Sequence, residues 1–460
     1  MHHLERIFCH SPQKPALHWG STVMTYGQLY EEAQQLAEFL KTGSGPLLVY
    51  GHKHPRMIAA LLACLLSKRP WMPCDLSMPM ARMEAAAAIC AANQLFLAEG
   101  IALPKEIEGI TSFSWEDVPP KTQNQPFSFQ PDTVAYIMFT SGTTGQPKAI
   151  PITLGNLENF AQWLLSYDQL ASAASDCVIN QANLSFDLSV ADWCAALCTG
   201  GVLRLTTKEE QQKLAPFFAH IAEAEGCFLA CTPTFLRLCA CDSSFCSRCL
   251  PGLRAIFLCG EPLPRTTAQL VMKRFPQTVL FHAYGPTEAT CAVCGLPLLP
   301  QHLEQEPLPV GQLSSAAVNI TLRDGEIILD GPSVFGGYLG QEPPASAAYA
   351  TGDLGRIENG LLYCLGRRDK QIKYMGYRID LNEIRLALET LPQVQQAAVI
   401  AQRDSHGVVR RLAAYLSPFP AETDDLRRAL SEQLPAYMIP QLFFPLEQLP
   451  VSANLKTQGG

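Results

Sequence analysis

A run of small residues that ends at a lysine is the clearest candidate for chemistry in this chain. Residues 136–148 read YIMFTSGTTGQPK, an apolar stretch that leads into glycines and hydroxyl residues. Glycines let backbone N–H groups approach a phosphate, hydroxyls donate to its oxygens, and lysine adds positive charge. A flexible surface loop is the alternative, and the Walker A spacing is absent. The string predicts a phosphate-binding loop formed by Thr140, Ser141, Gly142, Thr143, Thr144, Gly145 and Lys148.

Two further strings combine turns with carboxylates. Residues 283–290 read AYGPTEAT, which brings the Tyr284 ring and the Glu288 carboxylate close together across a tight turn. Such a ring can stack on a base, and such a carboxylate can hold Mg²⁺. In residues 349–356, YATGDLGR, Asp353 follows a glycine at a strand end, where it could accept both hydroxyls of a ribose. Taken alone, the second string is equally typical of an ordinary turn.

The elements that must position these residues alternate between strands and helices. Residues 26–40 and 57–66 have the apolar spacing of helices, and residues 46–50 and 71–74 read as strands. The same alternation predicts strands at 177–179, 227–230, 255–258 and 278–281. Dense strand–helix alternation is typical of parallel α/β sheets that are covered on both faces. From about residue 307 the strands shorten and turns multiply, which predicts antiparallel β structure.

The last part of the chain reads as a separate small domain. A charged segment, GRRDKQIK, follows Leu365, and helices are expected at 381–391 and 424–433 with a strand at 397–401. We therefore predict an α/β protein with a large N-terminal domain at 1–368, made of parallel α/β sheets and a β subdomain. A small mobile α+β domain at 369–460 follows it.

Composition excludes several classes of protein. Of the 460 residues, 48% are apolar and 17% charged, and the net charge is −8, so global disorder is excluded. No block of like charges indicates a nucleic-acid or membrane surface. The longest apolar run is too short to span a bilayer, and the first residues lack a signal-peptide core. Seventeen cysteines then read as mostly reduced thiols in a cytoplasmic protein.

Beyond their separate chemistry, these strings together resemble the adenylate-forming superfamily of acyl-CoA synthetases, luciferases and amino-acid adenylation domains. The resemblance extends over nearly the whole chain. In chain order the matching strings are TSGTTGQPK (140–148), LSFDLSVADW (184–193), AYGPTEAT (283–290), YATGDLGR (349–356), GRRDKQIKYMGYRIDLNEI (366–384), LPAYMIP (434–440) and LPVSANLK (449–456).

The resemblance implies roles for particular residues. Glu288 would hold Mg²⁺, Thr143 and Lys456 would act in catalysis, and Lys456 would neutralise charge between the substrate carboxylate and the α-phosphate. Asp369 would be the hinge about which the small domain rotates between two half-reactions. Leu455 departs from the usual glycine before the lysine. The implied ATP ligands outside the phosphate loop are Gly260, Glu261, Ala283, Tyr284, Gly285, Thr287, Asp353 and Arg367.

The acyl substrate is indicated by Asp187. In the peptide-synthetase branch of the superfamily the matching aspartate pairs with the substrate α-ammonium, and a buried carboxylate needs such a cation. The alternative is that Asp187 caps a helix at 188–197. FDLSV, FLCGEPLP and YGPTEATCAV look most like D-alanine–carrier protein ligases. The side-chain pocket mapped from the resemblance contains Asp187, Leu188, Ala191, Ala230, Phe257, Cys259, Ala283, Cys291 and Ala292.

The resulting hypothesis is a stand-alone enzyme that joins an amino acid to ATP as aminoacyl-AMP. It would then transfer the aminoacyl group to the phosphopantetheine thiol of a separate carrier protein, because no attachment string follows Lys456. D-alanine or another uncharged amino acid is expected, with Cys259, or its rival Cys291, crowding the substrate Cα. The alternatives are an acyl- or aryl-CoA ligase and a catalytically inactive homologue. A zinc site at Cys239, Cys241, Cys246 and Cys249 is a further, less favoured, alternative to ordinary thiols.

Overall fold

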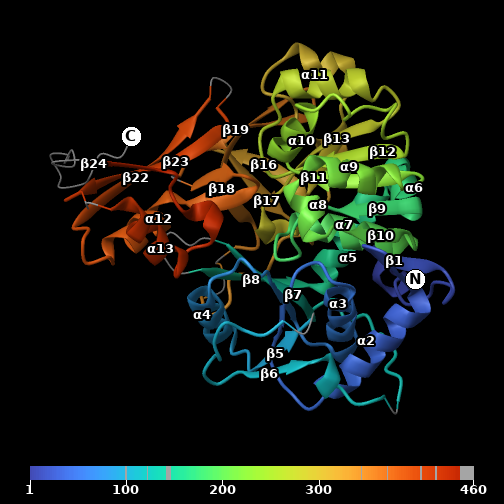
Figure 1. Cartoon of the computed structure of the whole chain (residues 1–460). Coiled ribbons are helices and arrows are strands. Elements are labelled where there is room, and N and C mark those ends of the chain that lie inside the picture. Colours follow the sequence, from blue (N-terminus) through green and yellow to red (C-terminus); the bar gives the residue numbers. More distant parts are fainter. Residues whose placement is uncertain are drawn as a thin grey trace.

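The computed structural model confirms the predicted α/β architecture (Figure 1). It describes residues 1–98, 101–121, 123–140, 147–342, 344, 346–369, 371–404, 407–419 and 422–445. Within them, two mixed sheets with helices and one antiparallel sheet precede residue 368, and two smaller sheets follow it. None of the helices described is long and apolar enough to cross a membrane.

The larger mixed sheet has eight strands and carries most of the candidate site. Its inner strands are parallel, and only the edge strands β2 and β14 run antiparallel to their neighbours. In spatial order the strands are β14 (Cys294–Pro297), β13 (Val279–Tyr284), β12 (Leu253–Leu258), β11 (Cys227–Cys231), β9 (Cys177–Asn180), β10 (Val202–Leu205), β1 (Pro15–Trp19) and β2 (Thr22–Thr25). The accompanying helices are α1 (His3–Arg6), α5 (Leu154–Leu165), α6 (Asp168–Asp176), α7 (Leu188–Thr199), α8 (Lys208–Gln212), α9 (Leu214–Ala222), α10 (Pro233–Ala240) and α11 (Arg265–Arg274).

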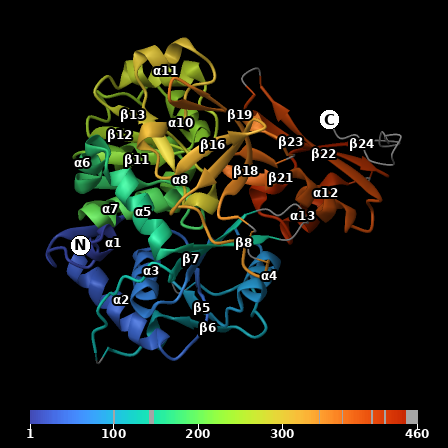
Figure 2. The same ribbon diagram turned by 180° about the vertical axis from the view of Figure 1, so that it is seen from behind.

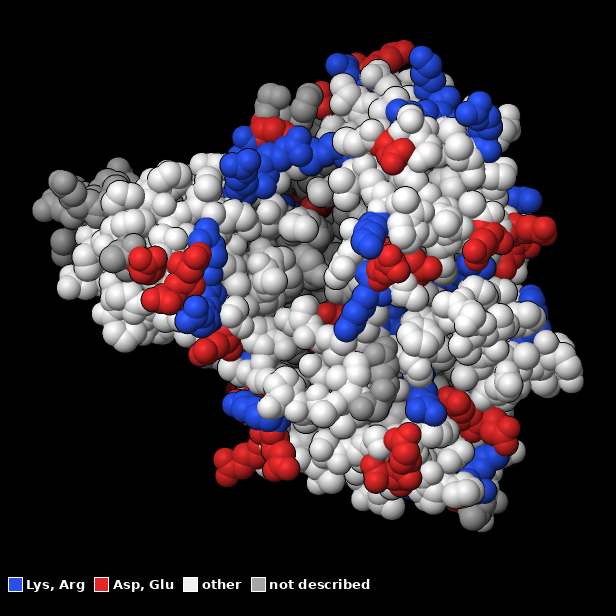
Figure 3. All heavy atoms as spheres, in the orientation of Figure 1, with Lys and Arg blue, Asp and Glu red and all other residues white. Residues whose placement is uncertain are grey.

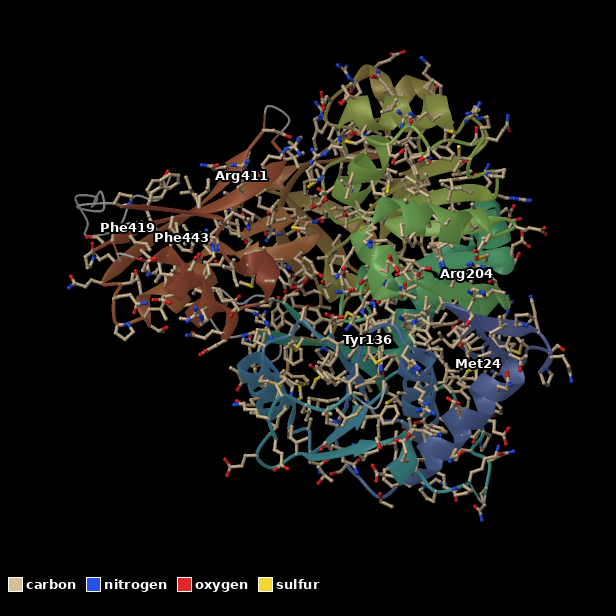
Figure 4. All side chains as sticks on the ribbon, viewed as in Figure 1. Met24, Tyr136, Arg204, Arg411, Phe419 and Phe443 are labelled. Atoms are coloured by element: carbon tan, nitrogen blue, oxygen red, sulfur yellow. The ribbon has the colours of Figure 1, made fainter. Side chains whose placement is uncertain are left out.

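A six-stranded sheet supports the loop predicted to bind phosphate. Its strands, in spatial order, are β6 (Thr111–Ser114), β5 (Gln94–Leu97), β3 (Leu47–Tyr50), β4 (Trp71–Cys74), β7 (Val134–Thr140) and β8 (Lys148–Thr153). Its helices are α2 (Tyr26–Leu40), α3 (Pro55–Ser67) and α4 (Met80–Cys90). Thr25 and Gln28 form a capping box that begins α2. Strand β7 runs through the middle of the molecule, where its buried residue Tyr136 is labelled in Figure 4.

A five-stranded antiparallel sheet occupies the stretch in which short strands were predicted. Its order is β15 (Gly311–Gln312), β19 (Leu361–Arg367), β18 (Tyr349–Glu358), β17 (Glu326–Asp330) and β16 (Asn319–Arg323). Asp353 lies opposite Arg367 in the register of β18 and β19. The short 3₁₀ helices described are η1 (Trp115–Asp117), η2 (Thr287–Ala289), η3 (Pro300–Glu304), η4 (Leu313–Ser315) and η5 (Ala436–Met438).

The described residues from Gln371 to Pro445, here called the C-terminal region, have a hydrophobic core of their own. They form the hairpin β20 (Gln371–Tyr374) and β21 (Tyr377–Asp380), the sheet β22 (Gln396–Arg403), β23 (Val409–Ser417) and β24 (Leu442–Pro445), and helices α12 (Leu381–Glu389) and α13 (Thr423–Ser431). Figures 1 and 2 show this region, in orange and red, beside the two mixed sheets. The separate core supports the predicted domain boundary, which stays a prediction.

Specific contacts join the C-terminal region to the rest of the chain. Arg82 on α4 forms an ion pair with Glu383 on α12 at 2.8 Å, and both side chains are buried. Arg237 on α10 lies 3.4 Å from Asp404, which follows β22. Removing one partner of a buried ion pair destabilises a protein by several kcal/mol, because the other charge is left buried without compensation. These contacts therefore favour this particular placement of the C-terminal region.

Candidate active site

A cleft between the mixed sheets and the C-terminal region brings most of the predicted site residues together. It is lined by Thr140, Asp187 and Asp353 from the large part of the chain and by Lys373 and Arg378 from the C-terminal region. Figure 3 shows the hollow, with Lys and Arg side chains along its rim. The cleft is the place where parallel strands end, which is the usual position of ligand sites in open α/β sheets.

Asp353, the predicted ribose ligand, accepts hydrogen bonds from one aromatic and one cationic neighbour. The Tyr284 hydroxyl donates to Asp353 Oδ2 at 2.7 Å, and Arg367 donates from Nη1 to Asp353 Oδ1 at 2.7 Å. Arg367 also holds Asp369 through two bonds of 2.7 Å. Asp353 is buried, so these partners compensate its charge. The arrangement links the end of β13, strand β18 and the predicted hinge residue.

The predicted metal ligand, Glu288, lies in the 3₁₀ turn η2 and is only 1% exposed. Arg378 on β21 donates to its Oε1 and Oε2 at 2.9 and 3.0 Å, and the Tyr338 hydroxyl donates to Oε1 at 2.7 Å. Burial alone would raise the pKa of Glu288, but the Arg378 guanidinium and the Tyr338 hydroxyl hold it below its ordinary value. Glu288 is therefore a carboxylate that needs a cation.

The residues present fit a Mg²⁺ ion that is held jointly by protein and nucleotide. Among the residues that the structure describes, no group of three or more His, Cys, Asp or Glu side chains could enclose a metal. Mg²⁺ in nucleotide sites is commonly bound through one or two carboxylates together with substrate phosphates. Glu288, a buried carboxylate next to the cleft-lining Thr287, matches that donor set.

Asp187 stands at the start of α7 but does not cap it through its side chain. Its backbone is in the right-handed helical conformation and its side chain makes no capping bond. Instead, its Oδ2 accepts a hydrogen bond of 2.5 Å from the Thr287 hydroxyl. Burial raises the pKa of Asp187, although Thr287 and the nearby Lys373 charge act in the opposite direction. A half-buried carboxylate that faces the cleft and lacks a close ion pair among the described contacts is suited to a substrate ammonium.

The predicted side-chain pocket is only partly formed around the cleft. Leu188, Cys259 and Cys291 line the cleft beside Asp187, and the Cys259 thiol donates to the Cys291 carbonyl at 3.6 Å. The other mapped positions are buried in the hydrophobic core and do not line the cleft; they are Ala191, Ala230, Phe257, Ala283 and Ala292. The space beside Asp187 is thus bordered by two cysteines and a leucine.

The loop between β20 and β21 closes one side of the cleft. The Gly376 N–H donates to Glu261 Oε1 at 2.8 Å, and Glu261 Oε2 accepts from the Thr234 N–H at 2.9 Å. Gly376 has a φ of +87°, and a Cβ there would lie 2.6 Å from Thr232 Cγ2. Both the backbone conformation and the close approach require glycine. Glu261, predicted as an ATP ligand, here anchors this loop.

Replacement of Gly376 by alanine should separate the two half-reactions that the sequence resemblance implies. The added Cβ would push the β20–β21 loop away from Thr232 and Glu261, so this placement of the C-terminal region would become less populated. We expect transfer of a pre-formed acyl group to fall by at least about tenfold, with adenylate formation nearly unchanged. Rapid-quench measurements of each step would test this. The control is Gly407→Ala, a positive-φ glycine with open space around it.

Some predicted site residues lie outside the described part of the chain, and others lie beside the cleft. Ser141, Gly142, Thr143, Thr144, Gly145 and Lys456 lie outside the described residues. Thr140 ends β7 beside the cleft, Lys148 begins β8 with its ammonium 4.9 Å from the Tyr338 ring, and Gly260, Gly285 and Thr287 line the cleft. The zinc alternative is not supported, because Cys239, Cys241, Cys246 and Cys249, all described, form no metal-binding group.

The sequence analysis did not identify Arg378, Tyr338 or Lys373 as site residues. Arg378 and Lys373 belong to the string KYMGYRID, so the matching motif was a signal that could have found them. Their contacts with Glu288 and Tyr284 depend on how the C-terminal region packs against the large part of the chain. Tyr338 lies in the Gly-rich segment before β18 and carried no recognisable signal.

The cleft brings together residues of the motifs that resemble the adenylate-forming superfamily. In agreement, residues 4–339 match the family described as "AMP-binding enzyme", and the chain belongs to that family. The match covers most of the large part of the chain, which includes Thr140, Asp187 and Glu288.

Named relatives give a more particular comparison. The chain is 32% identical to a D-alanine–D-alanyl carrier protein ligase of Bacillus anthracis, over 98% of this chain and 96% of that ligase. A solved NRPS protein that contains adenylation and PCP domains is 26% identical, with a TM-score of 0.84 over 99% of this chain and 83% of that protein. A Vibrio cholerae adenylation domain bound to glycyl-adenosine-5'-phosphate has the same TM-score at 21% identity, over 99% and 95% of the two chains, and supports the fold alone.

Proposed function

We propose that this protein is an AMP-forming ligase that activates an uncharged amino acid and passes it to the phosphopantetheine thiol of a separate carrier protein. The observation that carries the proposal is the Asp187 carboxylate, which lines the cleft and, among the described residues, accepts a hydrogen bond from the neutral Thr287 hydroxyl rather than from a cation. A fatty or aryl acid has no ammonium to compensate this charge. The named D-alanine–D-alanyl carrier protein ligases, at about a third identity over nearly the whole chain, support the same class.

In the first half-reaction, a carboxylate oxygen of the amino acid attacks the α-phosphorus of ATP, and the bond to pyrophosphate breaks. The chain contributes positioning and charge compensation. Asp187 holds the ammonium, Asp353 and Tyr284 hold the ribose and the base, and the loop from Thr140 to Lys148 holds the phosphates. A Mg²⁺ ion bound by Glu288 would neutralise phosphate charge. Lys456 would bridge the substrate carboxylate and the α-phosphate.

In the second half-reaction, a thiolate attacks the acyl carbon of the aminoacyl-AMP, and AMP leaves. The proposal includes a domain division at residues 1–368 and 369–460 with Asp369 as the hinge between them. The docking of Gly376 against Glu261 supports the view that this placement of the C-terminal region belongs to the transfer step. Lys456 would then lie away from the cleft during transfer.

A small substrate side chain is supported by the cleft beside Asp187. Leu188, Cys259 and Cys291 border it, and Ala191 and Ala230 are buried in the core. Cys259 would crowd the substrate Cα and favour one enantiomer, with D-alanine as the first candidate. A larger apolar amino acid is the second candidate, because each extra methylene changes selectivity by only about 1–3 kcal/mol.

The experiment that tests the proposal is ATP–pyrophosphate exchange with a panel of amino acids. We expect D-alanine, glycine or another small uncharged amino acid to give the fastest exchange, with Asp, Glu, Lys and Arg inactive. Fatty and aryl acids serve as controls, because the same fold is found in an acyl-CoA synthetase of Bacillus subtilis. Exchange driven only by those acids would favour a CoA ligase, and exchange with no acid would favour an inactive homologue.

A further inference from the structure

The contact between Arg378 and Glu288 joins the two parts of the chain at the predicted metal ligand. Arg378 comes from β21 in the C-terminal region, and Glu288 comes from the large part. One guanidinium nitrogen, Nη1, reaches both carboxylate oxygens, at 2.9 and 3.0 Å. Arg378 Nε also donates to Gln371 Oε1 at 2.6 Å, which fixes the guanidinium on the β20–β21 hairpin.

The same two oxygens are those that a metal ion would use. Glu288 is 1% exposed, and its other side-chain partners, the Tyr338 and Tyr349 hydroxyls, are neutral. A buried carboxylate needs a compensating cation, and Mg²⁺ binds carboxylate oxygens at about 2.0–2.1 Å. Arg378 Nη1 lies almost equally far from both oxygens, so it fills the position from which one cation contacts both of them. Arg378 and a metal ion that uses both oxygens therefore exclude each other at that position.

We infer that Arg378 and the nucleotide-bound metal alternate at Glu288, so that Arg378 is a positioning residue that couples domain placement to departure of the metal with pyrophosphate. This inference rests on the proposed function. While metal and phosphates occupy the site, the β20–β21 hairpin is kept away, and the Gly376 bond to Glu261 is open. When the metal leaves with pyrophosphate, Arg378 takes over the charge compensation of Glu288 and the C-terminal region docks as seen here.

Hydrogen exchange at the Gly376 amide provides a readout that is independent of activity. This N–H donates across the interface to Glu261, so its protection reports the docked placement. In the wild-type protein without ligand we expect protection, and Mg²⁺ with pyrophosphate should accelerate exchange about tenfold. Pyrophosphate without Mg²⁺ should have a smaller effect. Unchanged exchange on adding Mg²⁺ and pyrophosphate would overturn the inference without any variant.

Variants separate the charge of Arg378 from its bulk. Arg378→Gln should lose protection at Gly376 by about tenfold without ligand, and calorimetry should show Mg²⁺–pyrophosphate binding about tenfold more tightly. Arg378→Lys should restore much of both properties. The matched control is Arg385→Gln on α12, where the arginine pairs locally with Glu389. Weaker or unchanged metal binding in Arg378→Gln would contradict the competition.

Failure of the inference is distinguishable from failure of the proposed function. Neither exchange at Gly376 nor Mg²⁺–pyrophosphate affinity requires an amino acid or a carrier. If the wild-type protein activated no amino acid but both measurements behaved as expected, the alternation at Glu288 would stand and the substrate assignment would fall. If an amino acid was activated and Arg378→Gln bound metal like the wild type, only the alternation would be wrong.

Discussion

Replacement of Asp187 by alanine is expected to abolish amino-acid activation while nucleotide binding survives. The carboxylate lines the cleft and accepts a hydrogen bond from the neutral Thr287 hydroxyl. Without it, the substrate ammonium would enter the cleft unpaired. Breaking a buried charge pair costs about 3–5 kcal/mol, which corresponds to a fall of roughly 10²- to nearly 10⁴-fold in kcat/KM for the amino acid. The measurements are amino-acid-dependent pyrophosphate exchange and, separately, ATP affinity.

A matched control keeps this result interpretable. Asp168→Ala removes an exposed aspartate from the first turn of α6, so it tests the loss of a helix-terminal carboxylate without touching the cleft. Activation and ATP affinity should both stay within about twofold of the wild type. If Asp187→Ala activated amino acids as well as the control, the amino-acid class of substrate would be wrong. A parallel loss of ATP affinity would indicate a structural role for Asp187 instead.

Much of the fold could be predicted because buried parallel strands have a simple signature. The run Trp71 to Cys74 is the strand β4 with the predicted limits, and the helix predicted at 57–66 lies within α3. These segments are short and apolar, which fits a sheet covered on both faces. The start of α3 was missed because His54 caps it and Pro55 begins it, and neither residue belongs to the apolar run.

The members of the side-chain pocket stay a prediction, because local pattern does not assign them. Helix α7 is buried on every side from Leu188 to Cys198, so the apolar pattern does not indicate which face turns toward the cleft. Ala191 was assigned to the pocket by position in a motif, but the structure places it in the core. The Arg378 contact with Glu288 spans 90 residues and two parts of the chain, and such a contact depends on tertiary packing rather than on local pattern.

Replacement of Lys456 by alanine is expected to slow adenylate formation by about 10²-fold or more. The role is predicted from the string LPVSANLK, since Lys456 lies outside the described residues. The loss is the scale expected for one preorganised charged donor at a developing negative charge. Transfer from pre-made aminoacyl-AMP should stay nearly unchanged, because the proposed transfer step uses the placement in which Gly376 and Arg378 are docked, where Lys456 would not be needed. Single-turnover assays of each step would measure both rates.

The comparison between the two steps carries the argument for alternating domain placement. Lys41→Ala, at an exposed helix end, is the control for loss of a lysine and should leave both rates unchanged. Lys456→Ala should slow the first step, and Gly376→Ala should slow the second. Both residues belong to the predicted C-terminal domain, which follows the hinge residue Asp369. Equal losses in both steps for either variant would mean that one placement of the C-terminal region serves both reactions. If Lys456→Ala slowed only adenylate formation and Gly376→Ala slowed only transfer, the two steps would require two placements of the C-terminal region.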